Sequence, residues 1–310
     1  LKIADRIITN PHGSFIFDQV PDNLRDKPTL LTQLNSSSSA KQTVELGYLT
    51  SGLSWKADYV AELNSDDSQL NLTGWITLNN QSGTSYNNAK LQLVAGDVNQ
   101  VKTQLGRAMP RVAMMEMKTL ADAAVSEESL FEYHLYSLNR QTTLADKQVK
   151  QVALLSANAV PVSKQFLLQG NDYYYRSSVG DLGQKMKVAV FVEFDNNKQA
   201  HLGMPLPKGI VRVYKNDSKG NAQFVGEDGI EHTPKNEDVR LKLGDAFDVT
   251  ASKKQTDFKK AHHYKPHHVA YESAYEIEFK NAKSKAVTVT VREPVPGEWE
   301  ILKETHHHTK

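Results

Sequence analysis

The chain has 310 residues, and its 37 lysines and arginines against 36 aspartates and glutamates give a formal net charge of +1. A balanced charge produces no overall field that would attract nucleic acid or an anionic membrane surface. Cysteine is absent, which excludes disulfides, thiolate catalysis and cysteine-ligated metal sites. No run of about 18 apolar residues indicates a membrane-spanning helix.

Apolar and polar residues alternate with period two through much of the chain, most clearly over residues 287–292. Successive side chains of a strand point to opposite faces, so this pattern predicts strands with one buried and one solvated face. Turn-forming residues recur at about the 8–12-residue spacing that is typical of sandwiches and barrels. The sequence therefore predicts an all-β fold of antiparallel β-sandwich-like domains.

The first part of the chain is predicted to contain a hairpin over residues 3–17 and a further series of strands. These strands cover residues 28–35, 41–49, 55–64, 69–80 and 90–98. Trp55 and Trp75 lie on neighbouring predicted strands, where we expect them to face each other. Core packing is the favoured role for this pair, and a platform for a sugar ring is the alternative.

Residues 102–128 interrupt the alternating pattern, because β-branched residues nearly vanish and methionines gather there. This composition predicts a short helix or a mobile insertion between two sheet segments. Met114, Met115 and Met117 form the core of the cluster, and a methionine-rich stripe that binds a partner is the alternative interpretation.

Strands resume after the insertion and continue almost to the end of the chain. They are predicted over residues 130–136, 144–157, 160–168, 185–194, 210–214, 222–225, 239–243, 246–252, 269–280, 286–291 and 299–302. We divide the chain into a β-sandwich domain over residues 1–184 and a second sandwich-like domain over residues 185–310, and the insertion is the alternative position for this boundary. Residues 130–168 are expected to pair back with the first domain.

Motifs for common enzymatic chemistry are missing from the sequence. It contains no P-loop, no dinucleotide-binding glycine pattern and no nucleophile elbow, so no catalytic residue and no cofactor are predicted. Paired acids occur in turn-like contexts, at Asp66-Asp67, Glu127-Glu128, Glu227-Asp228 and Glu237-Asp238. Two such carboxylates facing each other across a cleft would suit a glycoside hydrolase, although acids in turns are most often simply solvated.

Histidines provide the candidate metal ligands, namely His262, His263, His267 and His268. Histidine-rich tracts bind zinc, copper and nickel. Adjacent histidines of a strand would point to opposite faces, however, so a solvated loop is the favoured interpretation. The three histidines 306–308 are interpreted as native residues of a frayed chain end.

Two further segments suggest contact surfaces. Tyr173, Tyr174 and Tyr175 form an aromatic triplet that, with the methionine cluster, is the predicted partner surface. Residues 203–209 contain two prolines between glycines. This segment is expected to turn the chain between edge strands, and docking of a partner in the polyproline conformation is the alternative.

Five segments of this sequence, in order along the chain, resemble a bacterial family called domain of unknown function 4139, which is in part described as mucoidy-inhibitor-A-like. They are residues 48–59, 89–96, 130–136, 202–209 and 295–299. The first contains Tyr48, Trp55 and Tyr59 in the family's tyrosine–tryptophan–tyrosine spacing. The resemblance implies an exported, β-sandwich-rich protein without established activity, with a signal peptide and another β domain upstream of Leu1. It also implies further strands beyond Lys310, so that the second domain of this chain would be truncated at its C-terminus.

These features together predict a non-catalytic binding or scaffolding module of the bacterial cell envelope, in the periplasm or outside the cell. The expected partner is a protein or an envelope polysaccharide rather than a nucleic acid. The alternative is a hydrolase that acts on polysaccharide or cell-wall material through the carboxylates in the turns.

Overall fold

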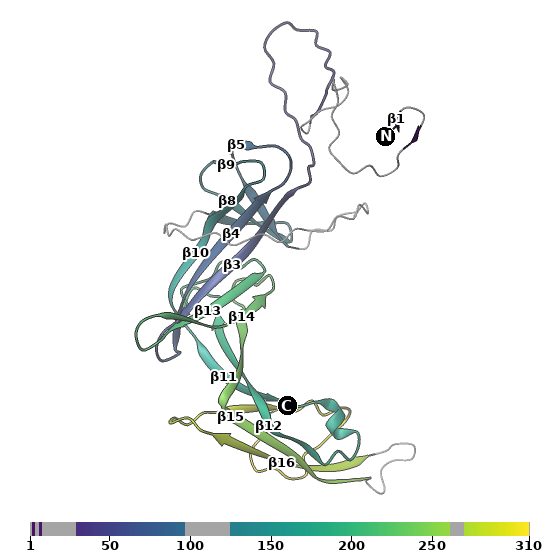
Figure 1. The fold of residues 1–310 in the computed structure, drawn as a ribbon, viewed down its shortest axis with the longest axis vertical. Helices are drawn as coiled ribbons and strands as arrows, with labels where there is room; N and C mark the ends of the chain where they lie inside the picture. Colours follow the sequence, from purple (N-terminus) through teal and green to yellow (C-terminus); the bar gives the residue numbers. More distant parts are fainter. Residues whose placement is uncertain (1, 4–5, 8–28, 97–124, 261–269, 310) are drawn as a thin grey trace.

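The structure is a computed structural model that describes residues 2–3, 6–7, 29–96, 125–260 and 270–309. Figure 1 shows an elongated molecule in which two groups of strands follow each other along the long axis. The described residues form strands and one short 3-10 helix, η1 (Asp172–Tyr175), so the predicted all-β fold is confirmed. No helix of these residues is long and apolar enough to cross a membrane.

The first group is built on a five-stranded sheet. Its strands, in spatial order, are β10 (Val149–Pro161), β4 (Gln69–Asn80), β3 (Leu53–Leu63), β13 (Gly209–Asn216) and β14 (Ala222–Ile230). Neighbours are antiparallel except β13, which runs parallel to β3. In β3 and β4 every second side chain is buried, as the alternation of the sequence predicts.

The inner face of this sheet packs against smaller β elements to form the first hydrophobic core. A three-stranded sheet of β6 (Gln92–Ala95), β8 (Tyr133–Leu138) and β7 (Val125–Leu130) contributes Leu93, Tyr136 and Leu138 to the core. A two-stranded sheet of β5 (Tyr86–Ala89) and β9 (Thr142–Leu144) adds Leu144. The sheets therefore enclose apolar side chains between layers, which is the basis of a sandwich.

A second five-stranded sheet forms the other end of the molecule. Its strands are β16 (Tyr271–Asn281), β15 (Asp238–Lys260), β12 (Asp181–Asp195), β11 (Ser163–Gln169) and β17 (Val289–Arg292). β17 runs parallel to β11 and the other neighbours are antiparallel. A smaller second core lies on this sheet and contains Phe166, Leu168, Val188, Val249 and Ala251. A separate pair of short antiparallel strands, β1 (Lys2–Ile3) and β2 (Arg6–Ile7), lies near the N-terminus.

β12 and β15 extend through both groups of strands. Val192 and Phe194 of β12 lie in the first core, whereas Val188 of the same strand lies in the second. β15 likewise contributes Leu241 to the first core and Val249 to the second. The sequence divides β15 into two shorter predicted strands, but hydrogen bonding to β12 continues across the irregular register near Gly244. Two continuous strands therefore join the cores.

Strands on either side of residue 184, the predicted domain boundary, pair with each other. β11, before this position, pairs with β12 and β17 after it, and β13, after it, pairs with β3 before it. Within residues 130–168, β10 pairs with β4 as expected. The hydrogen-bonded sheets thus do not follow chain order, and the division into domains stays a prediction.

Some predicted strands are wrong. Residues 29–50 contain no strand and their side chains are exposed, whereas strands were predicted over 28–35 and 41–49. Figure 1 shows this part leaving β3 as an extended loop. Residues 299–302 also lack a strand, and residues 125–128, assigned to the insertion, belong to β7. Alternation permits a strand, but a neighbouring strand must also supply hydrogen bonds, and none does so here among the described residues.

Candidate functional site

A buried lysine surrounded by three tyrosine rings is the most unusual polar arrangement in the second group of strands. The side chain of Lys253 in β15 is only 1% exposed, and its Nζ lies 2.7 Å from Oε2 of Glu293. The Nζ also lies 4.6 Å from the ring centroids of Tyr174 and Tyr275 and 5.5 Å from that of Tyr175. An ammonium ion at such distances is attracted by the negative faces of the rings.

Hydrogen bonds hold this tyrosine cage together. Tyr175 donates its hydroxyl to Oε2 of Glu293 at 2.8 Å, and Tyr275 donates to the backbone carbonyl of Tyr174. Gln255 donates to the Tyr275 hydroxyl at 3.0 Å. A Cβ atom at Gly170 would lie 2.1 Å from Oε2 of Glu293, so a larger residue there would displace the carboxylate. The chain's own lysine fills the cage, which makes it a structural clamp between β15, η1 and the segment after β17.

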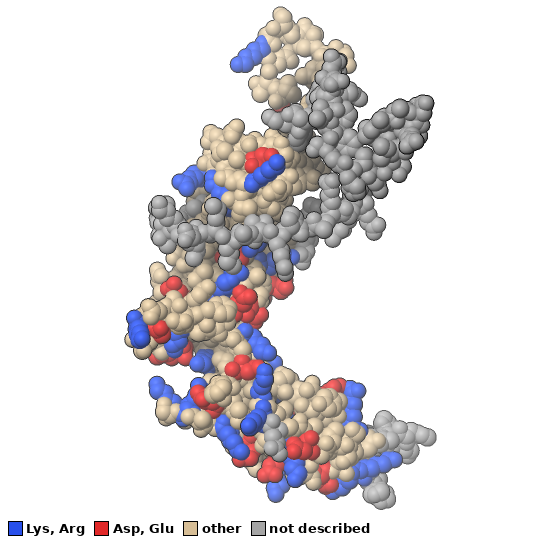
Figure 2. Space-filling model, viewed as in Figure 1, with Lys and Arg blue, Asp and Glu red and all other residues tan. Residues whose placement is uncertain are grey.

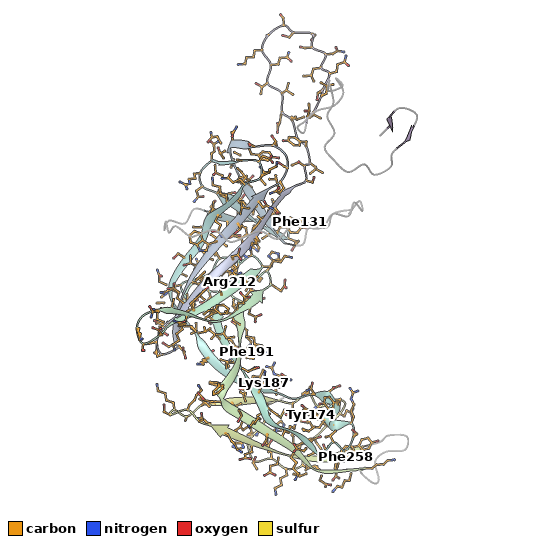
Figure 3. The ribbon with its side chains drawn as sticks, viewed as in Figure 1. Phe131, Tyr174, Lys187, Phe191, Arg212 and Phe258 are labelled. Atoms are coloured by element: carbon orange, nitrogen blue, oxygen red, sulfur yellow. The ribbon has the colours of Figure 1, made fainter. Side chains whose placement is uncertain are left out.

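The environment of the cage changes the proton affinity of its members. Burial lowers the pKa of Lys253, and the neighbouring Glu293 offsets this shift only in part. Burial also raises the pKa of Tyr175, and the hydrogen bond to Glu293 acts in the same direction. Figure 3 labels Tyr174 beside the strands of the second sheet. Both effects follow from the poor solvation of charges inside a protein.

The outer face of the first sheet combines aromatic, aliphatic and charged side chains. Trp75 of β4 is half-buried and lies opposite Asp58 of β3, which in turn lies opposite Ile210 of β13. Asp58 accepts hydrogen bonds from Lys56 at 3.1 Å and from Arg212 at 3.4 Å. The charged groups of this face are therefore already fixed by their neighbours.

Arg212, labelled in Figure 3, connects two carboxylates on this face. One of its nitrogens lies 3.4 Å from Asp58 and another lies 3.2 Å from Glu227 of β14. Thr77 adds a hydrogen bond to Asp58 at 3.4 Å, and Gln151 of β10 donates to Thr77 at 3.2 Å. A polar row therefore crosses all five strands of the sheet.

A surface cavity of about 430 Å³ lies on the three-stranded sheet. Its lining is mainly polar and comes from Lys90, Gln92, Ser126, Glu127, Glu128, Ser137, Leu138 and Asn139. Glu127 contacts Nδ1 of His134 at 2.7 Å. Glu127 and Glu128 are neighbours in β7 and both line the cavity, and the carboxylate of Glu127 is already engaged by His134.

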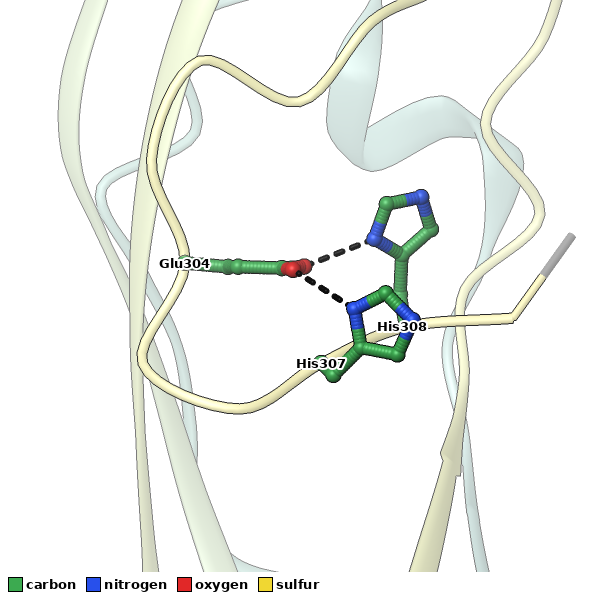
Figure 4. Close-up of side chains that lie close together, drawn as sticks. All are labelled: Glu304, His307 and His308. Carbon is green, nitrogen blue, oxygen red and sulfur yellow. Dashed lines mark hydrogen bonds and ion pairs between the residues drawn. The ribbon is translucent and has the colours of Figure 1, made fainter.

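A cluster of one glutamate and two histidines lies near the C-terminus (Figure 4). Glu304 contacts Nδ1 of His308 at 2.7 Å and Nδ1 of His307 at 3.4 Å. The hydrogen bond from His308 lowers the pKa of Glu304, and the contribution of His307 acts in the same direction. Within the described part of the chain, these three residues form the one group with the geometry to hold a metal ion.

The predicted site residues fall into two classes. His262, His263, His267, His268, Met114, Met115 and Met117 lie outside the described residues. In the predicted tyrosine surface, Tyr173 is exposed, Tyr174 is buried and Tyr175 is half-buried. Tyr174 and Tyr175 belong to the cage around Lys253, and the rings of Tyr173 and Tyr174 meet edge to face at 4.6 Å. The role of these residues as a partner surface stays a prediction.

The two tryptophans do not face each other, contrary to the expectation from the sequence. Trp55 packs against the first core, with its ring centroid 6.4 Å from that of Tyr136. Trp75 lies opposite Asp58, which is an odd number of residues from Trp55 along β3 and so points to the other face. A sugar platform made by the pair is therefore excluded by the register.

The proline-containing segment 203–209 is held inside the fold. Tyr59 donates its hydroxyl to the carbonyl of Pro207 at 2.7 Å, and Tyr136 donates to that of Pro205 at 2.8 Å. Both tyrosines are fully buried. Asn196 donates to the carbonyl of Met204 at 2.8 Å. Since these carbonyls already have partners, the segment serves as a packed turn, as favoured from the sequence.

Three of the five segments with family resemblance meet at this turn. Tyr59 comes from the first, Tyr136 from the third and Pro205 and Pro207 from the fourth. A Cβ atom at Gly209 would lie 2.3 Å from the carbonyl oxygen of Ala57, so glycine permits β13 to approach β3. These three segments therefore contribute to the packing of the first core.

The fold is thus that of an elongated all-β protein with two cores joined by continuous strands. The family described as Domain of unknown function (DUF4139) matches residues 44–299. The chain therefore belongs to this family, which confirms the resemblance of the five segments. No curated protein and no solved structure matches the chain.

The sequence interpretation missed both the caged lysine and the C-terminal cluster. Lys253 occupies the same alternating phase as Val249, Ala251 and Gln255, all of which are buried, so its position in a buried register was the available signal. The glutamate at position 304 precedes two histidines by three and four residues. That spacing was the signal for the cluster, but the histidines were interpreted as part of a frayed end.

Proposed function

We propose that the protein is a non-catalytic binding or scaffolding module of the bacterial cell envelope. The outer face of the first sheet carries this proposal. Trp75 and Ile210 provide apolar contact area, and Arg212 provides a cation beside them. Tryptophan and arginine are enriched among the residues that dominate binding energy at interfaces. The partner is a protein or an envelope polysaccharide.

Preorganisation of the charged groups supports binding in preference to catalysis. Asp58 is held by Lys56, Arg212 and Thr77, so little side-chain entropy remains to be lost when a partner binds. A hydrolase of the alternative type needs one acid and one nucleophile or base that face a shared cleft. Asp58 and Glu227 instead share one arginine between them on an open sheet face.

Charge elsewhere on the molecule is consistent with a partner that is not a nucleic acid. Figure 2 shows lysines and arginines interspersed with aspartates and glutamates over the second group of strands. The visible face has no large patch of one sign, and a nucleic-acid-binding surface needs a concentrated positive patch.

Site-specific photo-crosslinking in the native bacterium tests the proposal. A photoreactive phenylalanine analogue at Thr73, which lies on the outer face beside Trp75, is expected to capture a defined envelope component. The same analogue at Glu276, an exposed position on β16, serves as the matched control and is expected to capture none of it. Trp75→Ala in the Thr73 protein is expected to remove the product.

The proposal is contradicted if either the Glu276 control or the Trp75→Ala variant behaves like the original Thr73 protein. Equal capture from Thr73 and Glu276 would indicate non-specific contact, and capture that survives Trp75→Ala would place the binding surface elsewhere. Fractionation of cells that express the full reading frame tests the envelope location, for which a cytoplasmic pool alone is the contrary result. Release of soluble fragments from purified cell-wall polysaccharide by the chain would favour the hydrolase alternative.

A further inference from the structure

We propose that Glu304, His307 and His308 form a binding site for a divalent transition-metal ion of the zinc class. The cluster offers one carboxylate oxygen and two imidazole nitrogens, and these donor atoms all lie within 4.8 Å of one another. Imidazole and carboxylate are the usual nitrogen and oxygen ligands of zinc in proteins. Two histidines and one glutamate leave a fourth position for water or another ligand.

The separations of the donor atoms fit a tetrahedral ion. Metal–ligand bonds of about 2.0–2.1 Å place two ligands of a tetrahedron roughly 3.3 Å apart. Nδ1 of His307 lies 3.4 Å from Oε1 of Glu304, and Nδ1 of His308 lies 2.7 Å from Oε2 of the same carboxylate. The first separation is close to that of two ligands on one ion. The second needs an opening of about half an ångström, and a turn of the carboxylate presents one of its oxygens to an ion held by both imidazoles. Figure 4 shows both imidazoles directed at the same carboxylate from one side.

The site combines a supported side with an open side. The ring of His308 lies 5.8 Å from that of Trp299, which restricts its orientation. The side chains of Glu304 and His308 are 31% and 36% exposed, whereas that of His307 is 87% exposed. An ion can therefore enter from solvent, with His307 closing on it and His308 already restrained by Trp299.

The third histidine of the run provides a natural control. Nδ1 of His306 lies 3.2 Å from the hydroxyl of Thr305, and His306 is not a member of the cluster. A loosely histidine-rich end would use all three imidazoles interchangeably. A specific metal site uses His307 and His308 and does not need His306. The specific site and the non-specific histidine tract therefore make opposite predictions for His306→Ala.

Calorimetric titration of the full chain with ZnCl₂ tests the site. The background protein has His262, His263, His267 and His268 replaced by alanine, so that the other histidine tract contributes no binding. One equivalent of Zn²⁺ is expected to bind in this background. His308→Ala, and separately Glu304→Gln, should weaken binding by about tenfold or more, since even loss of a residue that only orients a ligand has that effect. His306→Ala should bind as the background does.

Several results would overturn the site. These are the absence of Zn²⁺ binding in the background protein, or equal weakening by His306→Ala and His308→Ala. Circular dichroism checks that each variant keeps its strands. If the protein with the four alanine replacements does not fold, His306→Ala and His308→Ala are compared in the unmodified chain instead. Quenching of Trp299 fluorescence by Cu²⁺ gives a local readout, which should disappear in Trp299→Phe and fall in His308→Ala but not in His306→Ala.

Discussion

The two hydrophobic cores solve the problem of buried polar groups in different ways. In the first core, the fully buried hydroxyls of Tyr59 and Tyr136 donate to the carbonyls of Pro207 and Pro205, so every group involved is neutral. In the second, smaller core region, the ammonium of Lys253 is paired with Glu293 and surrounded by tyrosine rings. Neutral hydrogen bonds thus serve the larger core, whereas a buried charge clamps the end that has the smaller core.

The difference matters because the two arrangements carry different risks. Moving an ion pair from water into a protein costs several kcal/mol per ion before the attraction of the pair is counted. Cation–π contact offsets part of this, at about 2 kcal/mol or more for a desolvated ammonium. Removing one partner leaves the other charge buried alone, which is more harmful than the loss of a neutral hydrogen bond.

Lys253→Ala is therefore expected to have the largest effect. It leaves Glu293 without its cation and should lower the free energy of unfolding by about 3–5 kcal/mol. Lys254→Ala, at the exposed neighbouring position on the same strand, should change it by no more than about 0.5 kcal/mol. Urea denaturation followed by circular dichroism measures both. Similar losses from the two variants would show that the clamp adds nothing beyond the strand itself.

Replacing the neutral donors of the first core should have a smaller effect. Tyr59→Phe and Tyr136→Phe each leave a buried proline carbonyl without a partner, so each should lower the free energy of unfolding by about 1–3 kcal/mol. Tyr271→Phe, at a side chain that is 52% exposed, is the matched control and should be close to neutral. A neutral result for both core variants would mean that water replaces the lost hydroxyls.

Alkaline pH should reduce the stability that the buried tyrosine hydroxyls contribute to the first core. Burial raises the pKa of Tyr59, with Tyr136 adding to the shift, and burial together with Glu127 raises the pKa of Tyr136. Each folded pKa lies above the unfolded value of about 10. The stability from these neutral hydroxyls is therefore fully present below about pH 10 and is lost as the pH rises through the folded pKa. The stability gap between the wild type and Tyr59→Phe should narrow above about pH 10, and a constant gap in urea melts up to pH 11 would contradict it.

The sequence predicted the parts of this comparison that depend on local pattern. The alternating residues of β4 predicted its boundaries and its buried face, because every second residue of a half-buried strand is apolar and points to the core. The parallel pairing of β13 with β3 joins residues about 150 positions apart, and no local pattern encodes such a partner. Residues 29–50 show the converse, since a strand-like pattern without a neighbour forms no strand.

Local sequence pattern likewise identifies residues of the candidate sites but not their partners. The tyrosine triplet was recognised as unusual, but its partner Lys253 lies in a different strand, and only the folded sheet brings Tyr174 and Lys253 together. Trp75 was recognised as well, but its face follows from the pairing with β3 rather than from the residue itself. Residue types can thus be selected from the sequence, whereas convergence comes from the topology.

The ion pairs of Asp67, which add to the continuous strands β12 and β15 between the two groups, should be the least costly contact to break. Asp67, in the turn between β3 and β4, accepts hydrogen bonds from Lys164 of β11 at 2.8 Å and from Lys215 of β13, so it links the second sheet to the first. Asp67→Asn should lower the free energy of unfolding by only about 0–1 kcal/mol, because Lys164 and Lys215 stay partly exposed and solvent screens their attraction to the carboxylate. Asp66→Asn, at the exposed neighbouring acid, is the matched control.

The pH dependence of this link distinguishes it from the tyrosine donors of the first core. Burial raises the pKa of Asp67, but the hydrogen bonds and charges of Lys164 and Lys215 outweigh burial and lower it below its ordinary value. A lowered folded pKa gives stability that is present above the unfolded value of about 3.9 and is lost as the pH falls through the folded pKa. The small gap between the wild type and Asp67→Asn should therefore close in acid, whereas the tyrosine gap closes in alkali. A gap of equal size at pH 7 and pH 3, measured by urea melts, would show that Asp67 acts through packing rather than through its charge.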